Sequence, residues 1–90
     1  MTTQNVALSR CYWRSRRGLL ELDLLLPPFV MAYFERLSDA QRAALQRLLD
    51  CDDHDIWSWF QQRSTPEDTA LGELVALIRA FNEQRNAPVK

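Results

Sequence analysis

The chain contains 90 residues, 47% of them hydrophobic, and carries a formal net charge of −1 at pH 7. A chain of this length has room for one core, so we expect a single domain over residues 1–90 with an ordered part at about 5–85. Its hydrophobic content argues against disorder, and its near-neutral charge argues against a general affinity for nucleic acid or anionic membranes. No apolar run approaches the ~20 residues that cross a bilayer, so we expect no membrane insertion.

The N-terminal segment, residues 1–10, has the features of neither a secretion signal nor a mitochondrial presequence, because it lacks an apolar core and is short and weakly basic. We therefore expect a cytoplasmic protein of bacterial origin. Cys11 and Cys51 are the only cysteines, and in that compartment they should stay reduced. A zinc site is disfavoured, because Cys11, Cys51 and the single histidine, His54, supply three ligands and a structural zinc ion needs a fourth.

Hydrophobic periodicity predicts an all-α fold, a compact bundle of about five short helices. Residues 5–16 form the first expected helix, with Asn5 as its N-cap. The second helix begins near Gly18 and meets Pro27 and Pro28, whose missing N–H groups predict a kink or a short break before an apolar run to about residue 36. The inward side chains expected in these two helices are Leu8, Cys11, Tyr12, Leu19, Leu22 and Leu26.

Capping signals mark three further helices. Ser38 and Gln41 match a capping box at the start of the third helix, and a run of acids at 52–55 opens the fourth. Thr65 as N-cap, with Pro66 at the first helical position, is expected to start the fifth. The predicted inward stripes are Ala44, Leu45, Leu48 and Leu49 in the third helix and Leu71, Leu74, Val75, Ile78 and Phe81 in the fifth.

Residues 16–23 interleave two arginines, a glycine and two carboxylates with leucines. On a helix starting near Gly18, Arg17 and Glu21 share a face, which favours a helix-to-helix turn closed by a surface ion pair. The alternative interpretation is recognition of another molecule. Planar guanidinium groups bind carboxylates and phosphates, and a glycine leaves room for another backbone. From the residues alone, both interpretations stay open.

A second cluster combines acids with tryptophans, since Asp52, Asp53 and Asp55 precede Trp57 and Trp59. The acids are accommodated by the dipole of the helix that they open, or they form an acidic rim beside an aromatic anchor for a partner. Trp57 and Trp59 lie about 200° apart around a helix, so one of them is expected at the surface.

The order of these segments resembles the SdhE-type FAD assembly factors of succinate dehydrogenase. The resemblance is carried by Arg-Gly-x-x-Glu and Leu-Asp within residues 16–23, by Pro28-Phe29, by residues 48–53 and 55–59, and by the position of Pro66. It implies a non-catalytic, chaperone-like factor that binds the flavoprotein subunit of succinate dehydrogenase or fumarate reductase and promotes the covalent attachment of FAD to that subunit. The partner-binding residues that it implies are Arg16, Arg17, Gly18, Glu21, Asp23, Asp52, Asp53, Trp57 and Trp59.

The chain contains no glycine-rich phosphate loop between a strand and a helix, so we expect the isolated chain to hold no FAD stably. A Ser/His/Asp or Cys/His arrangement cannot be argued from His54 alone, and we expect no enzyme activity. A function of another class, that of an antitoxin-like or other small helical regulatory protein, stays open, although no basic recognition helix points to DNA.

Overall fold

The computed structural model describes residues 3–85, with side chains from Val6 onward. Its elements in chain order are α1 (Thr3–Ser15), α2 (Leu20–Tyr33), the 3-10 helix η1 (Phe34–Arg36), α3 (Asp39–Leu49), α4 (Asp53–Phe60) and α5 (Thr69–Arg85). Residues 3–85 contain no strand, and the predicted all-α fold is confirmed. In this described part of the chain, every helix is too short or too polar to cross a membrane.

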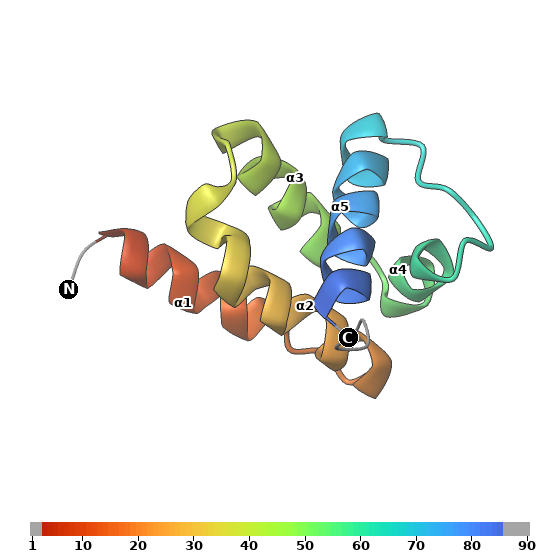
Figure 1. Ribbon diagram of the computed structural model, residues 1–90, viewed down its shortest axis with the longest axis horizontal. Helices are drawn as coiled ribbons and strands as arrows, with labels where there is room; N and C mark the ends of the chain where they lie inside the picture. The colour runs from red at the N-terminus through yellow and green to blue at the C-terminus, as the bar shows by residue number, and fades with distance from the viewer. Residues whose placement is uncertain (1–2, 86–90) are drawn as a thin grey trace.

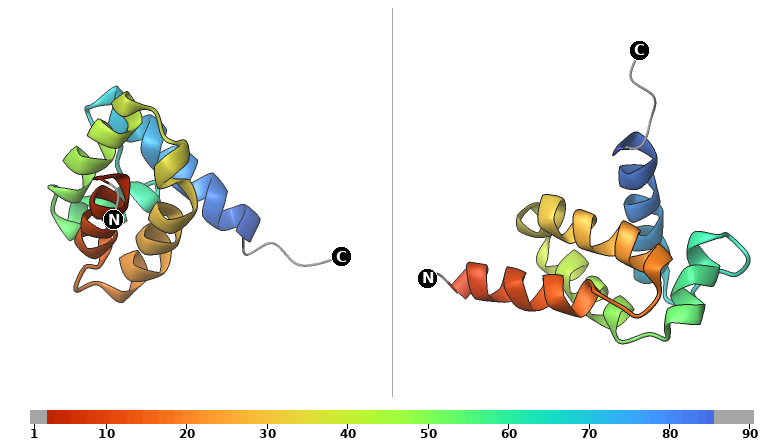
Figure 2. Two further views of the ribbon diagram at one scale, coloured as in Figure 1. Left: turned by 90° about the vertical axis from the view of Figure 1, so that its left-hand side faces the viewer. Right: turned by 90° about the horizontal axis from the view of Figure 1, so that it is seen from below.

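The helices form two packed groups, α1 with α2 and α3 with α5, which meet where α2 packs against α5 (Figure 1). α1 and α2 lie side by side and run in opposite directions, as both views in Figure 2 also show. α3 packs against α5, and α5 in turn packs against α2. α4 lies at the far end of the molecule from the start of α1, and residues 61–68 connect it to α5 by a long loop (Figure 1).

The core receives apolar side chains from every helix. Its largest fully buried members on α2 to α5 are Phe29, Leu22, Leu26, Leu45, Leu48, Ile56 and Ile78. The inward stripes predicted for the first, third and fifth helices are confirmed, with Cys11 fully buried and Leu8 and Tyr12 half-buried beside it. Burial of each large apolar side chain contributes about 1.5–3 kcal/mol, so this core is the main source of stability.

The predicted short break of the second helix is wrong, because α2 continues through Pro27 and Pro28 as far as Tyr33. The alternative, a kink at these prolines, stays a prediction. Pro28 has no N–H to give to the carbonyl of Leu24, the residue four positions earlier. That carbonyl instead accepts a hydrogen bond from Nη2 of Arg85 on α5 (2.9 Å). A side chain from a helix far away in the sequence thus replaces one missing backbone donor, and the helix does not need to break there.

Two of the predicted helix starts are also wrong. Asn5 lies inside α1, which begins at Thr3, so Asn5 is not the N-cap. Thr65 and Pro66 lie in the loop before α5. The cap of α5 is Asp68, whose carboxylate accepts a hydrogen bond from the backbone N–H two residues further on (2.9 Å). Both Thr65 and Asp68 are chemically suitable caps, and the local sequence does not rank them.

The predicted starts of the third and fourth helices are confirmed. Ser38 and Gln41 form the complete capping box of α3, with each side chain accepting from the backbone N–H of the other residue. Asp52 caps α4 by accepting a hydrogen bond from the backbone N–H of His54 (2.8 Å). Each cap of this kind contributes about 1 kcal/mol and sets where the chain turns into the helix.

Candidate functional site

Residues 16–23 lie where α1 ends and α2 begins, at one edge of the molecule (Figure 1). Residues 16–19 form the connecting loop. A hydrogen bond at each end of this loop holds it in place. Before the loop, the buried Ser15 donates its Oγ hydrogen to the carbonyl of Tyr12 (2.5 Å). After the loop, Asp23 in the first turn of α2 accepts a hydrogen bond from the backbone N–H of Arg17 (2.5 Å).

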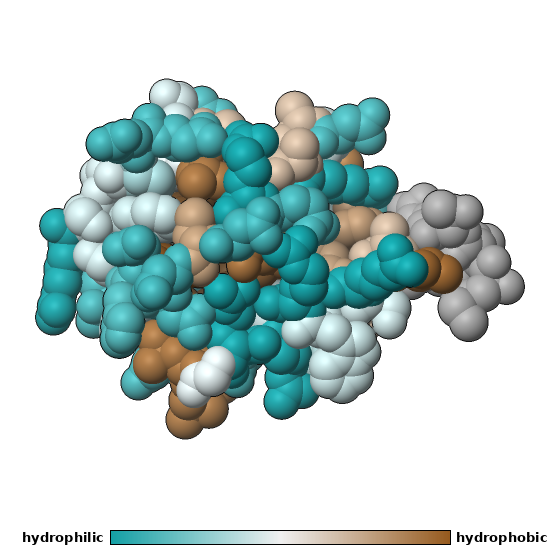
Figure 3. All heavy atoms as spheres, turned by 180° about the vertical axis from the view of Figure 1, so that it is seen from behind, coloured by the Kyte–Doolittle hydropathy of each residue, from teal (hydrophilic) through white to brown (hydrophobic). Residues whose placement is uncertain are grey.

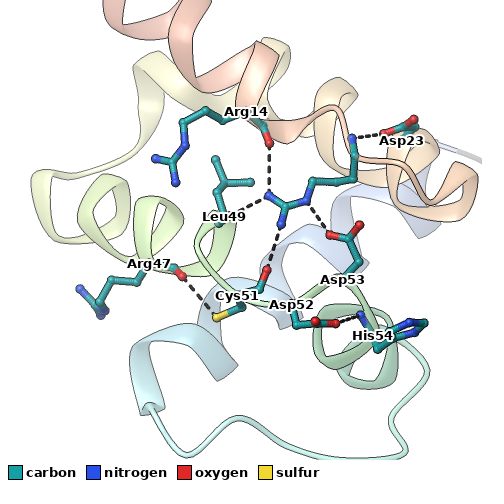
Figure 4. Close-up of polar contacts among 9 residues, drawn as sticks. Arg14, Asp23, Arg47, Leu49, Cys51, Asp52, Asp53 and His54 are labelled. Atoms are coloured by element: carbon teal, nitrogen blue, oxygen red, sulfur yellow. Dashed lines mark hydrogen bonds and ion pairs between the residues drawn. The ribbon is translucent and has the colours of Figure 1, made fainter.

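The Arg17 side chain leaves this loop and joins it to the turn between α3 and α4. Its Nε donates to Oδ1 of Asp53 at 2.7 Å, within an ion pair. Its Nη1 donates to the carbonyl of Leu49 (2.6 Å), and its Nη2 donates to the carbonyl of Cys51 (2.9 Å). Figure 4 shows these acceptors converging on one guanidinium group. Arg17 therefore holds two separate connections of the fold together.

The predicted surface ion pair between Arg17 and Glu21 is wrong. Arg17 precedes α2 and lies outside its helical spacing, and its guanidinium is directed to Asp53. Glu21 is exposed in the first turn of α2 and takes part in no ion pair within residues 3–85. The structure instead joins the two predicted clusters, because the Arg17–Asp53 ion pair connects residues 16–23 with residues 52–59.

The three remaining polar or small residues of the loop region point away from the core. Arg16 is exposed, and its guanidinium carbon lies 5.9 Å from the ring centre of Trp13. Gly18 does not have a positive φ, and a methyl group built on its Cα would meet nothing within 4 Å. The fold thus requires neither the conformational freedom nor the small size of Gly18. Together with Glu21, these residues offer an exposed set that contributes little to the packing.

Neither of the predicted tryptophans is fully buried. Trp57 and Trp59 are both half-buried and pack against the core, so the expectation that one of them lies at the surface is wrong. The most exposed tryptophan is Trp13 on α1, with 64% of its surface accessible. Sequence reasoning missed Trp13 as a surface residue, although the predicted inward positions at 8, 11 and 12 already placed position 13 towards solvent.

Comparison with known proteins identifies the family. A family model described as the flavinator of succinate dehydrogenase matches residues 9–82. The chain belongs to this Sdh5 flavinator family. It is 48% identical over 75 residues to the FAD assembly factor SdhE of Pseudomonas savastanoi, covering 83% of this chain and 89% of that relative. It is also 39% identical over 77 residues to the factor of the same name from Yersinia pestis, covering 86% and 88% of the two chains.

The span that matches the flavinator family includes every candidate residue described above. Residues 16–23 and 52–59 both lie inside it, as does the whole of α2. In this chain the two clusters form one continuous region, because Arg17 connects them. Its exposed members are available to a partner, whereas Arg17, Asp23 and Asp53 make contacts inside the chain.

The two cysteines of the chain are not activated nucleophiles. Burial raises the pKa of the Cys11 thiol to about 11. The pKa of Cys51 is also raised, first by burial and then by the negative charges of Asp55 and Asp50. Both thiols therefore stay protonated at neutral pH, and a protonated thiol is a poor nucleophile and metal ligand. Within residues 3–85, no group of three potential metal ligands lies close enough together to hold an ion.

Proposed function

We propose that this chain binds the flavoprotein subunit of succinate dehydrogenase or fumarate reductase and promotes the covalent attachment of FAD to it. Membership of the flavinator family supports this proposal. The structural observation that carries it is the exposure of Arg16, Gly18 and Glu21, which the fold itself does not require. Arg16, Gly18 and Glu21 have no role in packing, whereas Arg17 and Asp23 of the same segment hold the loop in place. Exposed residues of this kind are suited to contacts with a partner.

We assign the candidate residues to two roles. Arg16, Gly18 and Glu21 contact the partner, with Gly18 allowing close approach of its backbone. Arg17, Asp23 and Asp53 are positioning residues that hold the loop against the turn between α3 and α4. The remaining candidates, Asp52, Trp57 and Trp59, extend the contact surface along α4.

The proposed mechanism is non-catalytic for this chain. A protein that binds one conformation of its partner more tightly than another shifts the partner towards that conformation. The conformation favoured here is the one in which the flavoprotein's own histidine can react with FAD. In this mechanism FAD is bound by the partner and not by this chain. The isolated chain should therefore purify without flavin and show no stoichiometric FAD binding by calorimetry.

The test is co-expression in a bacterial host, since the relatives are bacterial and we place the protein in the cytoplasm. The flavoprotein subunit is produced with and without this chain in cells that lack their own factor. Covalent flavin is then measured by in-gel fluorescence under denaturing conditions. We expect fluorescence of the subunit to increase strongly when the chain is present. Equal fluorescence in both cultures would overturn the proposal, and a gel shift with DNA at low salt would favour the regulatory alternative.

A further inference from the structure

The outer face of α2 is apolar but uncovered. α2 is hydrophobic on nearly all sides, and a helix of that kind is normally buried all round. Its inner face is in the core, through Leu22, Leu26, Phe29 and Val30. On its outer side, however, Leu20, Leu24 and Met31 have 68%, 59% and 60% of their surfaces exposed. Figure 3 shows hydrophobic atoms gathered at its lower left, the corner of the molecule where α2 begins in Figure 1.

Two hollows adjoin along the line where α1 meets α2. The first has a volume of about 410 Å³, and Tyr12, Trp13 and Met31 form its main walls. The second has a volume of about 300 Å³ and shares Tyr12 and Met31 with the first. Leu20 and Arg16 line its other end. We name this continuous feature, lined by Trp13, Met31, Leu20 and Arg16, the α1–α2 groove.

The groove reaches the proposed partner site. Leu20 lies between Gly18 and Glu21 in the sequence, and Arg16 belongs to both features. A partner that contacts Gly18 and Glu21 is therefore already beside the open end of the groove. Exposed apolar surface of this kind in a small protein marks an interaction site, and exposed tryptophan and arginine are enriched at interface hot spots.

The charges along the groove favour a different protein over a second copy of this chain. Arg16, Glu21 and Asp23 lie towards the start of α2, whereas the end at Met31 is apolar. In a two-fold contact with antiparallel α2 helices, the charged end of one copy would face the apolar end of the other. With parallel helices, Glu21 and Asp23 would lie level with the same carboxylates of the second copy. Either arrangement desolvates charges without pairing them well.

Arg16 indicates the charge of the occupant. Two charged residues line the groove, Arg16 and Asp23. The Asp23 carboxylate already accepts a hydrogen bond from the backbone of Arg17, and Arg16 takes part in no ion pair within the described part of the chain. An arginine beside an apolar groove is complementary to an apolar segment that carries a carboxylate at one end.

We propose that the α1–α2 groove receives an apolar segment of the flavoprotein subunit, with an acidic side chain of that segment beside Arg16. The inference rests on the proposed function and extends it to a second part of the interface, reaching from the loop to Met31. The apolar contact contributes affinity, and Arg16 sets the direction in which the segment lies.

The experiment measures binding of the purified chain to the purified flavoprotein subunit by calorimetry. Met31→Ser tests the groove at the end far from the polar loop residues. Leu24→Ser is the matched control, because Leu24 is equally exposed on α2 but lines neither hollow. We expect Met31→Ser to weaken binding at least tenfold and Leu24→Ser to change it less than threefold. Both variants should melt within a few degrees of the wild type, since both side chains are already exposed. For the charge, Arg16→Gln should flatten the dependence of affinity on salt concentration.

The outcomes separate this inference from the proposed function. If the wild type binds the subunit and Met31→Ser binds equally well, the groove is not part of the interface, whereas the proposed function stands. If the wild type does not bind the subunit, both are wrong. Sedimentation equilibrium of the chain alone adds a third outcome, since a dimer that Met31→Ser dissociates would assign the groove to a second copy and overturn the inference.

Discussion

Arg17 and Glu21 lie four residues apart and belong to the same short motif, yet their surroundings differ completely. The guanidinium of Arg17 is directed into the molecule, where its side chain is 17% exposed and bonds to Asp53 and to the carbonyls of Leu49 and Cys51. Glu21 is exposed on the first turn of α2. The comparison shows that one sequence motif can contain both a connection that the fold needs and a residue that the fold can lose.

The difference has a direct consequence for interpreting variants. Loss of function after a change at Arg17 reports on folding and on the position of the loop. Under the proposed function, loss of function after a change at Glu21 would report on contact with another molecule. Variants at the two positions therefore separate folding from contact with a partner.

The largest expected effect is that of Arg17→Ala. This change removes the donors to Asp53, Leu49 and Cys51 and leaves partly buried acceptors without a partner. We expect a loss of about 2–4 kcal/mol in the free energy of unfolding, measured by urea denaturation. Arg17→Lys should recover only part of this loss, because one ammonium group cannot reproduce three separate donors in a planar fork. A loss below about 1 kcal/mol for Arg17→Ala would contradict the structural role of this residue.

A smaller effect is expected from Cys11 on the inner side of α1, opposite the exposed Trp13. The pKa of Cys11 is raised from its ordinary value of 9.0 to about 11 by burial. The unfolded chain therefore releases this proton first, and the contribution of Cys11 to stability falls as pH rises from about 9 towards 11. At pH 10 this contribution is lower by roughly 1 kcal/mol than at pH 7.

The measurement compares urea denaturation of the wild type and Cys11→Ala at both pH values. The difference in stability between the two proteins should narrow at pH 10. Because both proteins contain all the other titratable groups, the contributions of those groups cancel in the comparison. A difference that stays constant between pH 7 and pH 10 would show that the Cys11 thiol ionises as easily in the folded protein as in the unfolded one.

The loop before α5 offers a contrast to Gly18. Gln62 has a φ of 61°, in the left-handed region that favours glycine, whereas Gly18 has no positive φ. The chain thus carries a glycine where the backbone does not require it and lacks one where the backbone would favour it. We expect Gln62→Gly to raise stability by about 0.5 kcal/mol, because relief of strain outweighs the added freedom of the unfolded chain. A thermal melt checks the sign, and a lower melting temperature would contradict this explanation.

The smallest expected change in stability is at Gly18. Gly18→Ala should leave stability unchanged or raise it by up to about 0.5 kcal/mol, since the added methyl group meets nothing within 4 Å and the unfolded chain loses freedom. Thermal melts of Gly18→Ala and the wild type, recorded together, measure this directly. A destabilisation of more than about 1 kcal/mol at Gly18 would mean that the fold does require glycine there.

Much of the fold could be predicted because its determinants are local. The capping box at Ser38, the cap at Asp52 and the inward stripes depend on residues within one or two turns of each other. The features that were predicted wrongly depend on distant partners. The continuity of α2 depends in part on Arg85, which is 61 residues away from the carbonyl that it caps. No local spacing rule contains that information.

The same reasoning applies to the candidate site. The residue types of the motif indicated a site, but the spacing of Arg17 and Glu21 predicted the wrong ion pair. The true partner, Asp53, is 36 residues from Arg17, and only the packing of α1 against α3 and of α2 against α4 selects it. Met31 was missed as a surface residue because a single apolar side chain gives no signal in the sequence, whereas Trp13 could have been placed towards solvent from the inward positions at 8, 11 and 12. Both side chains are exposed beside the line where α1 meets α2.

The most direct test of the central claim measures folding and function together in Glu21→Ala. Thermal melting and covalent flavin on the co-expressed flavoprotein subunit are recorded for this variant and for Glu73→Ala, a control that removes another exposed acid, on α5. We predict that both variants melt as the wild type does, within about 1 kcal/mol in stability. Only Glu21→Ala should lose flavin attachment, because an interface anchor can contribute about 2 kcal/mol or more of binding energy. A folded Glu21→Ala variant that supports wild-type flavin attachment would contradict the account.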